Sequence, residues 1–227
     1  MRIRRAAAIS SSLTVLVLAG AVAGCSSPGY KTAEAKVESL GAVRTELDQG
    51  KKQIGVVVAA LEQVVTTGST DPRPAYDKFV AELANLESTA ANVKSRAESL
   101  QVQGKEYFQA WQTQLEGVQS AELRASSAQR QAQAKERFEK VRANSQIAKA
   151  SYQPFMSNLG DIKKVLAVDL NASGIASIAP VVARTKETAQ GVVTAVDNVI
   201  VEIDAVAAAI APKAAPVPPP TAEGQNK

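Results

Sequence analysis

The chain has 227 residues, 45% of them hydrophobic and 21% charged, so it is long enough to bury a substantial core. It contains no histidine and one cysteine. These counts exclude Ser-His-Asp and Cys-His catalytic sites, zinc fingers and internal disulfides. The formal net charge of +4 would suit a nucleic-acid partner.

The amino terminus is typical of an export signal. Three arginines among the first five residues precede an apolar stretch over residues 6–23, which ends in small residues. Without these three arginines the formal charge falls from +4 to +1, too little to attract nucleic acid. We therefore expect residues 1–24 to be a signal peptide. A transmembrane helix is the alternative, but three serines at residues 10–12 weaken it.

The end of the leader, Val22-Ala23-Gly24-Cys25, resembles the lipobox of bacterial lipoproteins. The resemblance implies that Cys25 is acylated and becomes the first mature residue. An ordinary signal peptide that leaves a free thiol is the alternative. We expect residues 25–32 to be a flexible tether. By the same resemblance, Ser26 implies sorting to the outer membrane, with the protein anchored by lipid in the inner leaflet and facing the periplasm.

Beyond the tether, apolar side chains recur at alternating steps of three and four residues, which is the heptad spacing of coiled coils. We call such a row along one helix a seam. The first seam covers residues 40–64, with a gap at Gly50. A break rich in Gly, Thr and Pro follows at residues 66–74 and ends this helix.

A second seam covers residues 76–111, and Gly104 within it predicts a close helix approach or a bend. A turn near residues 116–117 leads to a third helix. Its seam covers residues 138–166 and continues in register past Pro154, so we expect a kink there and no stop.

The last turn, residues 169–174, offers Asn171 or Ser173 as a helix cap. The fourth seam covers residues 175–210. Its valines favour a strand individually, but alternation with a period of two is absent. The Pro/Ala-rich residues 212–227 predict a disordered tail.

Four seams with short connections predict an all-α fold over residues 33–211: an elongated antiparallel bundle of four long helices with coiled-coil-like heptad seams. The alternative is a thinner rod whose helices pair locally or with a second copy. Small seam residues allow close helix approach in either arrangement; they are Ala90, Ala97, Ala148 and Ala189.

Three stretches carry a family resemblance: residues 123–129, the seam around Pro154 and residues 170–178. Together with Trp111, they resemble proteobacterial envelope proteins grouped as domain-of-unknown-function family 2959. Relatives often carry Lys-His-Asn before the Leu-Asn-Ala turn, where this chain has Ala-Val-Asp at residues 167–169. The resemblance implies a long helical lipoprotein and supplies no activity.

The residues offer no catalytic, metal-binding or cofactor motif, so we expect neither an enzyme nor a cofactor. The acidic residues lie mostly outside the seams, which favours a solvated face over a metal site. The aromatic cluster Tyr107, Phe108 and Trp111 could line a ligand pocket, but core packing is favoured. The basic stretch at residues 124–137 could bind peptidoglycan or anionic lipid, but an exposed helix face is favoured.

Two function classes remain. The first is a non-enzymatic envelope scaffold that docks a protein or peptidoglycan, and the alternative is a carrier that holds a lipid or another hydrophobic ligand between its helices. A carrier requires an apolar pocket of at least ~300 Å³, whereas a scaffold needs no internal void. Lys227 at the end of the tail resembles, in outline, the lysine that joins the major lipoprotein to peptidoglycan, but a terminal lysine without such a role is favoured.

Overall fold

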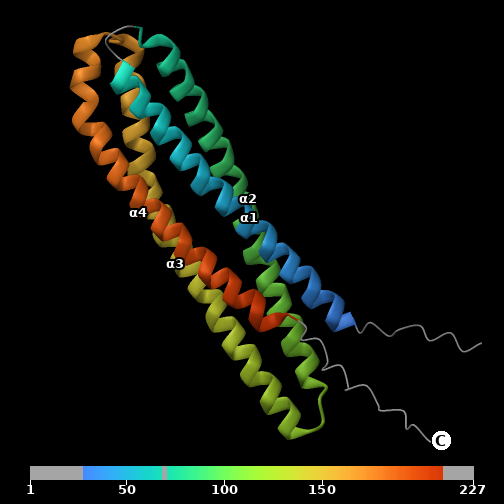
Figure 1. The fold of residues 1–227 in the computed structure, drawn as a ribbon. Helices are drawn as coiled ribbons and strands as arrows, with labels where there is room; N and C mark the ends of the chain where they lie inside the picture. Colours follow the sequence, from blue (N-terminus) through green and yellow to red (C-terminus); the bar gives the residue numbers. More distant parts are fainter. Residues whose placement is uncertain (1–27, 68–70, 212–227) are drawn as a thin grey trace, which may run out of the picture.

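The computed structural model describes residues 28–67 and 71–211, which form four helices (Figure 1). They are α1 (Pro28–Thr67), α2 (Arg73–Glu116), α3 (Ala121–Val168) and α4 (Ala172–Ile210). The described residues contain no strand, and the all-α four-helix bundle expected from the seams is confirmed.

Several expectations fall outside the described residues. These are the signal peptide, the lipobox residues Val22, Ala23, Gly24 and Cys25, and the tail over residues 212–227. The helix α1 begins at Pro28. Residues 28–32, which were expected to belong to the flexible tether, therefore form the first turn of α1.

The helix boundaries follow local signals in the sequence. Ser120 caps α3, since its hydroxyl oxygen accepts a hydrogen bond from the Leu123 amide at 3.3 Å. Asn171 is the cap of α4: its Oδ1 accepts from the amides of Ser173 and Gly174 at 2.9 and 3.1 Å. The third helix continues through Pro154, as expected. The fourth continues through Pro180, which the sequence analysis did not consider.

Each helix packs against two neighbours, and α1–α3 and α2–α4 share no contact in the part of the chain that the structure describes. The helices therefore form a ring of four, in the order α1, α2, α3, α4. The longest helix, α3, has 48 residues, which corresponds to about 72 Å at about 1.5 Å per residue. The turn between α2 and α3 extends beyond the start of α1 and the end of α4 (Figure 1).

The seams supply the core, which consists of two clusters along the bundle. The cluster nearest the α3–α4 turn contains fully buried side chains from all four helices, among them Leu61, Phe79, Phe155 and Val192. The second cluster lies towards the α2–α3 turn and includes Leu40, Leu100, Val141 and Ile203. The middle of the bundle lies between these two clusters.

Among the residues that the structure describes, every ion pair between two helices involves α1. Arg44 pairs with Asp204 of α4 at 3.0 Å, and Lys51 pairs with Asp197 of the same helix. Glu62 pairs with Lys186 of α4, and Glu46 pairs with Arg96 of α2 at 2.9 Å. No ion pair joins α2 to α3 among the described residues, and these two helices share the least contact of any neighbouring pair.

Candidate functional site

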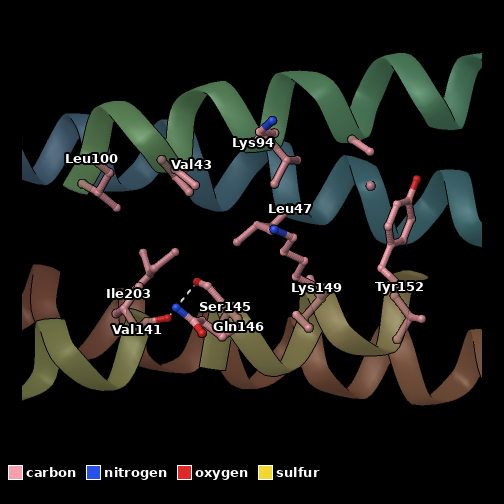
Figure 2. Close-up of a pocket in the computed structure, with 18 of the residues that line it drawn as sticks. Val43, Leu47, Lys94, Leu100, Val141, Ser145, Gln146, Lys149, Tyr152 and Ile203 are labelled. Atoms are coloured by element: carbon pink, nitrogen blue, oxygen red, sulfur yellow. Dashed lines mark hydrogen bonds between the residues drawn. The ribbon is translucent and has the colours of Figure 1, made fainter. Parts of the chain in front are cut away.

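An open cleft of about 740 Å³ lies in the middle of the bundle, between α2 and α3 (Figure 2). Its floor consists of aliphatic side chains of the other two helices, including Val43, Leu47 and Ile54 of α1 and Val199 and Ile203 of α4. Figure 2 shows α1 and α2 on one side of the gap and α3 and α4 on the other. The lining is mainly apolar, and polar residues gather at the mouth.

The cleft coincides with small residues in the seams that face it. Ala90 and Ala97 of α2 lie opposite Ser145 and Ala148 of α3, and all four line the cleft. The sequence analysis interpreted three of these residues, with Ala189, as positions of close helix approach. Only Ala189 is buried in the core. The other three are partly exposed, because α2 and α3 stand apart where they lie.

Aromatic packing closes the end of the cleft near the α2–α3 turn. The Phe138 ring of α3 lies on the backbone of Gly104, where an added Cβ would be 2.3 Å from Phe138 Cζ. Phe138 also makes an edge contact with Phe108, at 5.8 Å between ring centroids. Beyond it, Gln131 Nε2 donates a hydrogen bond to the Phe108 carbonyl at 2.9 Å. The expected close approach at Gly104 is therefore confirmed.

Tyr152 lies at the opposite end of the cleft. Figure 2 shows the Tyr152 ring extending from α3 across the gap towards α1 and α2. Its hydroxyl oxygen is buried and has no hydrogen-bond partner among the described residues. Burial, with a smaller contribution from the charge of Glu87, raises the pKa of Tyr152 to about 12. Further along, Tyr76 Oη donates to the Lys163 carbonyl at 3.2 Å and joins α2 to α3 again.

The mouth carries more positive than negative charge. The charged residues that line the cleft are Lys51, Lys94, Arg142 and Lys149, against Glu98 as the one acidic residue in the lining.

Three of these four cations have carboxylate partners. Lys51 is held by Asp197, whose hydrogen bond raises the pKa of the lysine. Arg142 lies 3.5 Å from Glu139, and Lys94 lies 3.9 Å from Glu98. Lys149 has no ion-pair partner among the described residues, and Figure 2 shows its amine extending into the gap beside Leu47.

The other sites considered from the sequence do not form ligand sites of comparable size. Tyr107 contacts Phe108 and Trp111 edge to face, and Trp111 Nε1 donates to Ser127 Oγ at 3.0 Å. This cluster therefore packs α2 against α3, as expected, beside a cavity of only about 20 Å³. The basic side chains at residues 124–137 lie on an exposed face of α3.

Two further properties concern metals and membranes. Across residues 28–67 and 71–211, no three acidic or cysteine side chains converge on a position that could hold a metal ion. Within the same ranges, none of the helices combines the length and apolarity needed to cross a bilayer.

Sequence reasoning missed the cleft and its lysines. The seams indicated which side of each helix faces inward, and the small residues were visible. The distance between α2 and α3 at those residues depends on which side chains meet across the two helices, and a single helix's periodicity does not contain that information. One signal could have revealed the cleft: small seam residues lie between aromatic residues. These aromatics are Phe138, which packs on Gly104, at one end and Tyr152 at the other.

One comparison with known proteins gives a match. The family described as "Protein of unknown function (DUF2959)" matches residues 24–210. No curated protein and no solved structure matches the chain.

Proposed function

We propose a ligand-binding role for this chain, which belongs to domain-of-unknown-function family 2959. In this proposal the protein is anchored to the bacterial envelope by a lipid on Cys25, catalyses no reaction, and holds a hydrophobic ligand in the cleft between α2 and α3. The proposal selects the carrier from the two function classes that the sequence left open.

The cleft is the observation that carries the choice. Its volume of about 740 Å³ falls within the ~300–1,000 Å³ of small-molecule sites. A scaffold that works through its outer face needs no void, whereas apolar side chains around an open space leave aliphatic surface in contact with water. A bound apolar ligand would remove that surface from water.

The lipid anchor is supported by sequence alone. The lipobox Val22-Ala23-Gly24-Cys25 follows a basic and apolar leader, and the region matched by the family begins at residue 24, one residue before the cysteine. Two or three acyl chains on Cys25 would hold the protein stably at a membrane. That location would give a carrier direct access to lipids.

Ligand extraction tests the binding role. The full-length protein, purified from membranes, should release a stoichiometric lipid or other apolar molecule into organic solvent, detected by mass spectrometry. Ala148→Phe places a ring in the cleft and should abolish the bound molecule. Ala125→Phe makes the same change on an exposed face of α3 and should leave it in place.

The alternative function makes the opposite prediction. In that case the purified protein carries no apolar molecule and binds none when offered detergent-solubilised envelope lipids. It instead retains a protein or a peptidoglycan fragment, in Ala148→Phe as well as in Ala125→Phe. This outcome would establish the scaffold and show that the cleft has no ligand.

A further inference from the structure

Lys149 narrows the class of ligand. Its ammonium group extends over an aliphatic floor beside Leu47, with no carboxylate partner among the described residues. Lys94 of α2 also lines the cleft and has only the distant contact of 3.9 Å to Glu98, with side chains 76% and 67% exposed. A cation above an apolar surface suits a ligand with a negative head and an apolar body.

The dimensions of the cleft favour a single chain. Its lining runs from Leu86 to Gln101 on α2 and from Phe138 to Gln153 on α3. Each of these segments spans about 22 Å at about 1.5 Å per residue. The acyl chains of one leaflet of a bilayer span about 15 Å, half of the ~30 Å hydrocarbon core. One acyl chain therefore fits lengthwise along the floor.

We propose that the ligand is a single-chain anionic amphiphile, with its acyl chain along the floor of the cleft and its negative group paired with Lys149 and Lys94. A fatty acid carboxylate and the phosphate of a single-chain phospholipid share this chemistry. The inference rests on the proposed function, since it specifies the ligand of the same cleft. It adds a charge requirement that a merely hydrophobic site does not have.

Binding of matched twelve-carbon probes to the full-length protein tests the charge requirement. Titration calorimetry below micelle-forming concentrations compares dodecanoate, dodecyl phosphate, the neutral dodecanol and the cationic dodecyltrimethylammonium. Both anions should bind roughly 3–10-fold more tightly than dodecanol, as expected for partly exposed ion pairs. The ratio of the affinities for dodecanoate and dodecyl phosphate indicates whether the cleft prefers a carboxylate or a phosphate headgroup.

A variant of Lys149 tests whether this lysine pairs with the negative group of the ligand. Lys149→Gln should weaken the binding of dodecanoate by up to about 5-fold, as expected for the loss of one exposed ion pair, and leave the binding of dodecanol unchanged. Lys140→Gln removes the same charge from an exposed position of α3 that pairs with Glu136 and does not line the cleft, so it should change neither affinity. Melting temperatures of both variants show whether the fold is intact.

The outcomes separate the inference from the proposed function. If all probes bind alike and Lys149→Gln changes nothing, the anionic ligand is refuted and the hydrophobic carrier stands. If no probe binds, both proposals fail. If the protein is a dimer that Ala148→Phe makes monomeric and that no probe dissociates, a second copy occupies the cleft, and the amphiphile is refuted.

Discussion

The contact between Gly104 and Phe138 predicts that replacing a glycine by alanine has opposite effects on stability at two positions of the bundle. A Cβ at residue 104 would lie 2.3 Å from Phe138 Cζ, and within 2.9 Å of both neighbouring ring carbons, so Gly104→Ala forces the ring or α2 to move. Overpacking of this kind costs about 1–3 kcal/mol. The gain from replacing a helical glycine by alanine is about 1 kcal/mol, so the free energy of unfolding should fall by up to about 2 kcal/mol.

Gly55→Ala is the matched control. Gly55 lies in the interior of α1, is exposed, and has no atom within 4 Å of an added Cβ, so only the helix propensity changes. Its free energy of unfolding should rise by about 1 kcal/mol. The two variants should therefore shift the melting temperature in opposite directions, by about 2–4 °C per kcal/mol in a domain of this size.

Thermal and urea unfolding followed by circular dichroism measures both variants. Adding Phe138→Leu to Gly104→Ala removes most of the ring and should restore part of the lost stability, with a coupling energy of about 0.5–3 kcal/mol. If Gly104→Ala stabilises the protein as much as Gly55→Ala does, the ring does not lie on Gly104. The end of the cleft is then not where the structure has it.

Four further predictions concern the core, the cleft, metals and the anchor. Ile178→Asp places a charge at a site that is 3% exposed and should cost about 3 kcal/mol or more, whereas the exposed Glu187→Ala should change stability by less than about 0.5 kcal/mol; similar melting shifts would contradict the facing of α4. Tyr152→Phe removes a buried hydroxyl without a partner and should raise the stability of the ligand-free protein by up to about 1 kcal/mol. The folded protein holds the pKa of Tyr152 at about 12 against an ordinary 10.0, so its contribution to stability is full below pH 10.0 and is lost as the pH rises towards 12, and alkaline unfolding should show this loss in the wild type and not in the variant. A chelator and a reductant should leave the helical circular dichroism unchanged; a large loss would reveal a carboxylate metal site. Cys25→Ser should abolish palmitate labelling and membrane retention, and a wild type without label would refute the lipid anchor.

The architecture was predictable because the spacing of apolar residues along a long helix shows which of its faces is buried. The three-and-four spacing places Leu40, Val57 and Ile203 inside the bundle, where they are 2%, 0% and 1% exposed. The cap at Asn171 was predictable for a similar reason: a side chain that accepts from its own following amides acts within four residues. Such signals are local, and one sequence suffices to find them.

The cleft was not predictable in this way because it depends on pairs of helices. Ala97 and Ala148 belong to seams, and alone each is compatible with close packing. Larger rings of the same lining, Phe138 and Tyr152, lie towards the two ends of the cleft, and small residues lie between them. The registration of α2 against α3 decides which small residues meet, and it follows from the whole bundle.

The connections between α2 and α3 at both ends of the cleft give it a fixed length. Tyr152 lies at one end, with the bond from Tyr76 to Lys163 further along the same helices, and the contacts of Gly104 and Phe108 join the helices at the other end. Under the proposed function, an acyl chain that enters would gain about 0.8 kcal/mol for each methylene it buries, but only until about 22 Å of floor is covered. Any further carbons remain in water and add nothing. The protein would thus select ligands by chain length. Affinity would rise with each added carbon and level off once the acyl chain is as long as the cleft.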